Sequence, residues 1–370
     1  EMALAMQKHP NKKHAIEIRE VKSHRFVREM VGHTDWPTCV AYSSDESLLV
    51  SGSLDKTVRI WDTSTGSEST LLAGHQEPVV GVSFLPNSPH VVSVDSEGVV
   101  VVWNVGSKSI DRSWKTEARV KAVSFHPTLP WIVFASKNKR VELWDVLQGV
   151  KRGELPNDGD VSLVCFSPNG DRLATVADDK ISRIWRTQEL VEPKQANPIS
   201  ELQGHSDTIT SISFSPDGKR LVSLSRDESV RLFDVDHGYE LFRLDSDKGT
   251  SGIVQFSVDG KSVVRTLPGN FSTWSIRNAV SSDSSNTTLE SKAWHKAKSS
   301  AAMKNGDYFA AAFHYGWLIQ LDPATMTHYR DRANARMLLG DFSEAEQDLI
   351  QCDGKIDASG QKRLLADLAS

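Results

Sequence analysis

Three sets of residues that resemble the parts of a hydrolase active site recur in this chain of 370 residues. The sets are His33, Ser51 and Asp55; His75 and Ser93, with Glu97 in the acidic position; and His205, Ser223 and Asp227. Serine, histidine and a carboxylate can serve as nucleophile, base and orienting acid. Such an enzyme needs one exposed nucleophile beside an oxyanion hole, whereas these sets recur at equivalent positions along the chain. The recurrence therefore favours a buried hydrogen-bond network that fixes turn geometry.

The histidines belong to a longer repeat. Each follows a glycine and precedes an aromatic residue by the same interval in all three sets, and that aromatic position occurs six times. The six residues are Trp61, Trp103, Trp144, Trp185, Phe233 and Trp274, at spacings of 42, 41, 41, 48 and 41 residues. Within each unit, turn residues separate short apolar runs about every 8–12 residues, which predicts four short strands. One all-β unit of about 41 residues is therefore repeated.

The Gly-His and Trp-Asp pairs, such as Gly32-His33 and Trp61-Asp62, resemble the WD-repeat β-propeller over roughly residues 15–276. The resemblance implies an all-β propeller of four-stranded antiparallel blades, six in this chain, with a longer array left open. It also implies a buried hydrogen-bond chain from a loop histidine through a hydroxyl residue to the tryptophan and an aspartate. The residues at those offsets are His33, Ser51, Asp55, Trp61, His75, Ser93, Trp103, Thr175, Asp179, Trp185, His205, Ser223 and Asp227.

The ends of the repeat array predict how the ring closes. Residues 1–14 form a lead-in with a short helix, and residues 15–31 match the third and fourth strands of a blade. We expect Arg25–Val31 to be the outer strand of the blade that ends at Trp274, closing a six-bladed ring. The interval of 48 residues contains Gln188–Asn197, which we expect to be a loop insertion at a blade edge.

A different period begins after the propeller, which is expected to span residues 15–280. Residues 281–290 form a serine-rich linker, and in residues 291–370 the pair Gly306-Asp307 recurs as Gly340-Asp341. This period of about 34 residues resembles the tetratricopeptide repeat (TPR), with two repeats and a partial or capping helix at Gln361–Leu368. The combination resembles the C-terminal portion of a large bacterial multidomain WD-repeat/TPR protein.

Composition argues against several functions. The net charge of −5 gives no electrostatic footprint for nucleic acid, and three separated cysteines indicate a reducing, cytoplasmic compartment. No apolar run approaches the ~18 residues of a membrane span. Because the phosphate-loop, kinase and zinc-protease motifs are missing, we expect no enzyme, cofactor, metal or small-molecule substrate. The chain begins at Glu1, so we expect a piece of a longer protein.

These features predict a non-enzymatic scaffold that binds protein or peptide partners on two surfaces. The first surface is formed by the propeller loops that enter each first strand, and the second is the concave face of the TPR helices. The candidate residues are Trp36, Arg119, Lys121, Asp160 and Thr208 on the loops, and Lys296, Arg330 and Asn334 on the helices. The alternative is a non-catalytic regulatory or recruiting region of a larger signalling enzyme, such as a bacterial Ser/Thr protein kinase.

Overall fold

The computed structural model describes thirteen stretches of the chain, which divide into a β unit and a helical unit. The stretches are residues 2–5, 14–20, 25–117, 119–137, 139–155, 159–191, 197–245, 252–257, 259–267, 270–275, 285–306, 308–339 and 342–353. The β unit comprises Glu1–Gly238 and Phe242–Ile276, and the helical unit comprises Tyr239–Leu241 and Arg277–Ser370.

The described strands of the β unit form seven antiparallel sheets, each built from strands in chain order. The two three-stranded sheets are β1 (Met2–Ala5), β2 (Ala15–Arg19) and β3 (Phe26–Val31), and β24 (Ile253–Phe256), β25 (Ser262–Leu267) and β26 (Asn270–Ser275). The first three four-stranded sheets are β4 (Pro37–Tyr42), β5 (Leu48–Ser53), β6 (Thr57–Asp62) and β7 (Glu68–Ala73); β8 (Val79–Phe84), β9 (His90–Asp95), β10 (Val99–Asn104) and β11 (Ser109–Lys115); and β12 (Val120–Phe125), β13 (Trp131–Ser136), β14 (Val141–Asp145) and β15 (Val150–Leu155). The other two are β16 (Leu163–Phe166), β17 (Arg172–Val176), β18 (Ser182–Arg186) and β19 (Ser200–Leu202); and β20 (Ile209–Phe214), β21 (Arg220–Ser225), β22 (Ser229–Asp234) and β23 (Glu240–Asp245).

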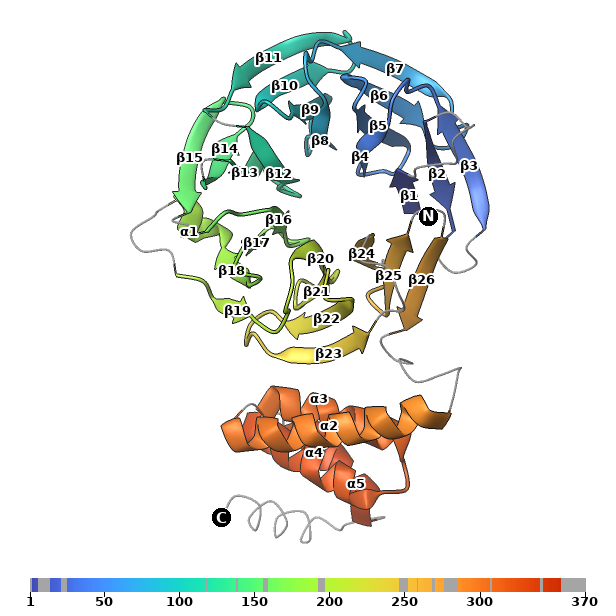
Figure 1. Ribbon diagram of the computed structural model, residues 1–370, viewed down its shortest axis with the longest axis vertical. Coiled ribbons are helices and arrows are strands. Elements are labelled where there is room, and N and C mark those ends of the chain that lie inside the picture. Colours follow the sequence, from blue (N-terminus) through green and yellow to red (C-terminus); the bar gives the residue numbers. More distant parts are fainter. Residues whose placement is uncertain are drawn as a thin grey trace. The chain divides into compact units, whose positions relative to one another are not determined.

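Figure 1 shows these sheets as blades around a common centre, with the first strand of each repeat innermost and the fourth outermost. Neighbouring blades meet through their inner strands, such as β4 with β8 and β12 with β16. Each third strand carries the repeat aromatic, for instance Trp61 on β6 and Trp103 on β10. The repeat inferred from the sequence is therefore the blade, as the resemblance to a propeller implies.

The expected ring closure is wrong. The strand β3 does not complete the last blade, because it pairs with β2, which pairs in turn with β1 in a separate sheet. Residues 2–31 therefore contribute a seventh blade, and the expected helix in residues 1–14 is replaced by the strand Met2–Ala5. Among the described residues, β26 pairs with β25 alone, so its outer edge is open.

A β-bulge marks the second residue of the first strand in four blades. The pairing register shifts between Pro37 and Cys39, Val79 and Gly81, Val120 and Ala122, and Ile209 and Ser211. A bulge leaves one residue outside the ladder and changes the direction of its side chain. The bulged residues are Thr38, Val80, Lys121 and Thr210, so the same local geometry presents three kinds of side chain in four blades.

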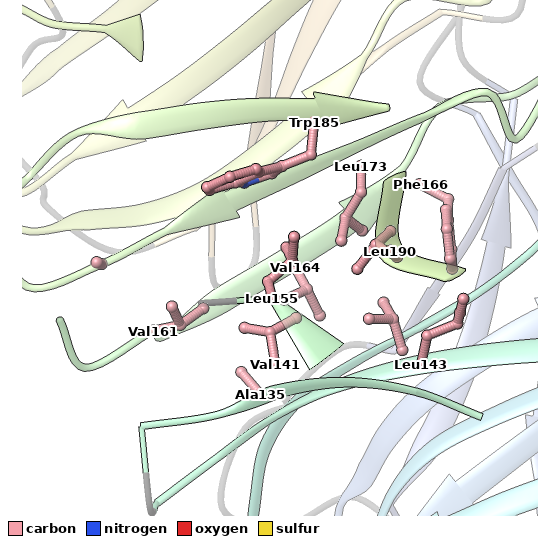
Figure 2. Close-up of a cluster of buried hydrophobic side chains, with 12 residues drawn as sticks. Ala135, Val141, Leu143, Leu155, Val161, Val164, Phe166, Leu173, Trp185 and Leu190 are labelled. Carbon is pink, nitrogen blue, oxygen red and sulfur yellow. The ribbon is translucent and has the colours of Figure 1, made fainter. Parts of the chain in front are cut away.

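Apolar side chains between the blades form the core of the β unit. Figure 2 shows the cluster between the blades β12–β15 and β16–β19, which contains Leu143, Phe166 and Trp185. The cluster also contains Leu190 of the short helix α1 (Thr187–Val191), a helix where the sequence predicts a loop insertion. Burying one such large apolar side chain contributes ~1.5–3 kcal/mol, so this cluster is a major part of what holds the two blades and α1 together.

The helical unit contains four described helices: α2 (Ser285–Asn305), α3 (Tyr308–Leu321), α4 (Met326–Leu339) and α5 (Phe342–Asp353). Consecutive helices pack against each other along the chain. Because α2 begins at Ser285, the predicted linker over 281–290 is wrong in its second half. The helices α3 and α5 begin at Tyr308 and Phe342, an interval that matches the period in the sequence. The predicted capping helix at Gln361–Leu368 lies outside the described residues.

Candidate partner-binding face

The first histidine set forms one continuous chain of hydrogen bonds beneath the loops of the blade β4–β7. His33 lies 2.8 Å from Asp55 through Nδ1 and 2.8 Å from the Ser51 hydroxyl through Nε2. The Trp61 indole N–H donates to the same hydroxyl oxygen at 2.8 Å. The side chains of His33 and Asp55 are 1% and 3% exposed, and Ser51 is fully buried. A serine without access to solvent cannot attack a substrate, so this set is a structural network.

The protonation states fit this network. Burial lowers the pKa of His33, which keeps the ring neutral near pH 7. Burial acts to raise the pKa of Asp55, but hydrogen bonds from Thr57, Thr34 and His33 outweigh it and hold that pKa at about 2. An ionised carboxylate only accepts hydrogen bonds, so a neutral His33 donates from Nδ1 to Asp55 and accepts at Nε2 from Ser51. Each polar side-chain atom of this hydrogen-bond network thereby has a partner.

The second set uses a different carboxylate from the one that the sequence predicts. His75 lies 2.7 Å from the Ser93 hydroxyl, but its Nδ1 lies 3.0 Å from Asp95 and not beside Glu97. Asp95 stands two residues before the expected position, at the offset of Ser53 in the blade β4–β7. The Trp103 indole donates to Ser93 at 2.7 Å, so the network is complete. The assignment of Glu97 to it is therefore corrected.

The remaining blades keep parts of the pattern. His205 contacts Asp227 at 2.9 Å and Ser223 at 2.7 Å, while Phe233 has no N–H to add. The Trp185 indole donates to Thr175 at 2.9 Å, as expected. Asp179 does not join that network in the described contacts, but pairs with Arg183 at 2.6 Å.

The blade β12–β15 replaces the histidine network with an interaction that sequence reasoning missed. The Trp144 indole donates to the Glu142 carboxylate at 3.0 Å, and Lys151 donates to the other oxygen of that carboxylate at 2.9 Å. The alternation of Val141-Glu142-Leu143-Trp144 places Glu142 and Trp144 on one face of the strand. That alternation was the sequence signal from which the contact between Glu142 and Trp144 could have been predicted.

The candidate residues on the propeller loops lie at the starts of the first strands, where the sequence places them. Trp36 is half-buried rather than exposed, with the His14 ring edge-on to it at a centroid distance of 4.5 Å. Arg119 forms an ion pair with Glu97 of the preceding blade, and Lys121 forms one with Asp160 of the following blade. Loops of adjacent blades therefore meet through opposite charges.

The other candidates are separate from this group. Thr208 is exposed at the start of β20, and its N–H donates to Asp207 at 2.6 Å. In the helical unit Lys296 on α2 and Arg330 on α4 are exposed, and Asn334 is half-buried one turn after Arg330.

Two features of the helical unit were not foreseen. Asp348 on α5 is 4% exposed and accepts from Arg332 at 2.9 Å and from Arg336 at 2.6 Å, which ties α4 to α5. His295 on α2 and His314 on α3 lie 2.9 Å apart through their Nδ1 atoms. Burial lowers the pKa of His295 to about 4 and that of His314 to about 3. Both rings are therefore neutral at pH 7, and they join α2 to α3.

A groove of about 640 Å³ lies at the opposite end of the sheets, beside α1. Trp131, Val191 and Ile199 supply apolar walls, and Arg172 and Arg186 line it as well. Arg172 pairs with Asp236, and Arg186 pairs with Glu189 at 3.1 Å, so both cations are already neutralised. Among the described residues, no group of three or more His, Cys, Asp and Glu side chains is placed to hold a metal ion. No described helix combines the length and the apolar character needed to cross a membrane.

Comparison with known proteins decides the family. Residues 24–62, 66–104, 111–145, 150–186 and 196–234 match the family described as WD domain, G-beta repeat. These matches cover just over half of the chain. The chain belongs to the WD40 repeat family. Each WD40 match contains the outer strand of one blade and the inner three strands of the next, and the matches include all three histidine networks.

Several eukaryotic WD40 proteins are similar to the chain. An uncharacterized WD repeat-containing protein of Schizosaccharomyces pombe is 26% identical over 60% of this chain and 61% of its own length. The target of rapamycin complex subunit LST8 of Saccharomyces cerevisiae is 27% identical over 54% of this chain and 67% of its own length. Pre-mRNA-processing factor 19 homolog 2 of Arabidopsis thaliana is 28% identical over 53% of this chain, but only 37% of that protein is spanned.

Proposed function

We propose that the chain is a non-enzymatic scaffold whose propeller loop face binds protein partners. One observation carries this proposal. Four blades repeat the bulge in the first strand, yet the bulged residue is threonine in two of them (Thr38 and Thr210), valine in one (Val80) and lysine in one (Lys121). A rigid frame that presents different side chains from equivalent loops suits recognition of an irregular partner surface. WD40 repeats generally mediate protein–protein interaction, and LST8 is named as a subunit of a complex.

The helices supply a second surface in this proposal. Their repeat period and consecutive packing support a pair of TPR units, with Lys296, Arg330 and Asn334 available to a peptide. The alternative role is that of the recruiting region of a larger signalling enzyme. The matched part of the chain spans less than two thirds of the first relatives, down to 37% of the plant pre-mRNA-processing protein.

Partner capture from native extract tests the proposal. Trp36→Ala removes an aromatic side chain at the loop face, and Arg119→Glu with Lys121→Glu reverses two charges there. Side chains of this kind often dominate an interface, and each truncation then costs ~2 kcal/mol or more. We expect both variants to lose partners that the unchanged chain recovers, while Lys219→Glu at the opposite end of the sheets keeps them. Unchanged recovery by both variants, with their fold verified by circular dichroism, would overturn the proposal.

A further inference from the structure

One blade has loops with the opposite charge from its neighbours. Two stretches are compared in each blade. The first is the seven residues that end four residues before the aromatic at the end of the first strand, and the second is the three-residue turn between the second and third strands. In the blade β12–β15 these residues include five cations and one carboxylate: Lys115, Arg119, Lys121, Lys137, Lys139 and Glu117. The same stretches carry Asp35, Asp55 and Lys56 in the blade β4–β7; Glu77 and Glu97 in β8–β11; Asp158, Asp160, Asp178, Asp179 and Lys180 in β16–β19; and Asp207, Arg226, Asp227 and Glu228 in β20–β23. Among the five four-stranded blades, β12–β15 is thus the one whose compared stretches carry a positive balance of charge, in a chain of net charge −5.

The loss of the histidine network permits this reversal but does not force it, because β16–β19 also lacks the histidine and keeps Asp178 and Asp179. In the blade β4–β7 the turn carboxylate Asp55 contacts His33 and accepts from the Thr57 N–H at 2.9 Å. In β12–β15 the corresponding turn reads Lys137-Asn138-Lys139, and Thr116 stands at the histidine offset. Without a histidine to orient, the turn no longer requires a carboxylate. The two lysines replace the negative charge that the other blades keep.

The cations of this blade lie together and face solvent. The Lys137 N–H donates to the Arg119 carbonyl at 2.9 Å, which holds the turn against the loop that enters β12. Arg119, Lys121, Lys137 and Lys139 are all exposed. Arg119 and Lys121 have carboxylate partners on the adjacent blades, whereas Lys137 and Lys139 have no ion-pair partner among the described residues.

From this distribution we infer that the loop end of the blade β12–β15 binds an acidic peptide segment of a partner protein, with Lys137 and Lys139 as its main contacts. The inference rests on the proposed scaffold function and names the chemistry of the partner. Each exposed ion pair contributes only ~0–1 kcal/mol, so binding needs several of these cations together and is sensitive to salt. The carboxylates Asp160, Asp178 and Asp179 on the next blade would repel a long polyanion such as duplex DNA. A short acidic segment fits within the positive region.

The test measures fluorescence anisotropy of labelled peptides with the full chain. The peptides are a short oligoglutamate, a phosphoserine-rich peptide of equal length and an uncharged peptide of the same length. We expect the unchanged chain to bind one or both acidic peptides and not the uncharged one, with weaker binding at higher salt. Lys137→Glu with Lys139→Glu should weaken this binding about tenfold or more, the equivalent of ~1.4 kcal/mol or more. Lys219→Glu with Lys261→Glu makes the same charge change in the exposed turns at the opposite end of the sheets and should leave affinity unchanged.

Each outcome supports or contradicts the inference. Tighter binding of the phosphoserine peptide would assign phosphorylated segments as the source of the negative charge, and tighter binding of oligoglutamate would assign carboxylate-rich segments. Absence of binding to both acidic peptides, equal loss in the control variant, or tighter binding of a DNA duplex would overturn the inference. If acidic peptides fail to bind while Arg119→Glu with Lys121→Glu still loses native partners, the scaffold function stands and only this inference falls.

Discussion

The blades β4–β7 and β12–β15 share one backbone plan but are stabilised differently. In β4–β7 a buried histidine joins the entering loop to the second strand and the following turn, through Ser51 and Asp55. In β12–β15 the tryptophan contacts Glu142, and the helix α1 packs against the outer strand β15. The histidine network is therefore one of two ways in which these blades fix the tryptophan and the loops around it. A blade that fixes its tryptophan in another way can carry charged residues at the loop and turn positions that the network would otherwise occupy.

The largest difference between the two blades is expected from removal of the loop histidine. His33→Leu removes one hydrogen bond from the buried Asp55 carboxylate and takes away the acceptor of the buried Ser51 hydroxyl, and each buried polar group left short of a partner costs ~1–3 kcal/mol. Thr116→Val, at the same offset in β12–β15, removes only a hydroxyl and should cost about 1 kcal/mol. Urea unfolding midpoints of the full chain would measure both changes. Equal destabilisation would show that the loop histidine has no special role.

The next effect concerns the packing of α1 against the outer strand of the blade β12–β15. A Cβ atom at Gly153 would lie 1.6 Å from the carbonyl oxygen of Leu190 in α1, so Gly153→Ala must displace the helix backbone. We expect a loss of ~3 kcal/mol, at the upper end of overpacking costs. The control Gly106→Ala meets only a side-chain oxygen at 3.5 Å and should change stability by less than ~0.5 kcal/mol. A Gly153→Ala variant as stable as the control would contradict the packing of α1 described above.

A smaller effect is expected from the two tryptophans. Trp61→Phe loses the indole donor to Ser51 and leaves space in a fully buried site, which we expect to cost about 2 kcal/mol. Trp144→Phe should cost about 1 kcal/mol, because that side chain is half-buried and Glu142 retains Lys151. Thermal unfolding of the two variants side by side measures the difference. A larger loss of stability for Trp144→Phe than for Trp61→Phe would contradict the prediction that β4–β7 depends more on its indole hydrogen bond than β12–β15 does.

The smallest effect is expected from mild acid. Burial lowers the pKa of His33 below its unfolded value of about 6.5, so the stability that the neutral ring contributes is complete above that pH and declines as pH falls below it. The Asp55 partner, with a pKa of about 2, stays ionised throughout. Hydrogen exchange, corrected for its intrinsic pH dependence, should therefore rise slightly more in β6 than in β14 between pH 7.5 and 5. A larger rise in β14 would contradict this assignment.

Much of the β unit is predictable from the sequence because the repeat residues have strong local roles. The spacing of Trp61, Trp103 and the other aromatics defines the blades, and the offsets of His33 and His205 define their networks. Ring closure was not predictable, because Met2–Ala5 consists of helix-forming residues and adopts a strand only through pairing with β2. The Ser285 start of α2 also lies in a polar segment typical of a linker.

The candidate site was predictable in position but not in interactions. Counting back from each strand-ending aromatic finds Arg119 and Lys121, because the bulge recurs at a fixed offset. The count does not reveal that Glu97 forms the ion pair with Arg119 while Asp95 forms the hydrogen bond with His75. Both carboxylates flank one turn, and only the folded geometry separates their roles. Lys137 and Lys139 were missed for a related reason. The two lysines become part of a positive region only because their turn packs against the loop that contains Arg119.

The recurring Ser-His-Asp sets are buried structural networks and not active sites, which is central to the proposed non-enzymatic function. Labelling of the folded chain with a fluorophosphonate probe, followed by peptide mass spectrometry, tests this directly, with a known serine hydrolase as the positive control. Because Ser51, Ser93 and Ser223 are fully buried, the account predicts no probe on any of them. Stoichiometric labelling of one of these serines in the native chain would contradict it.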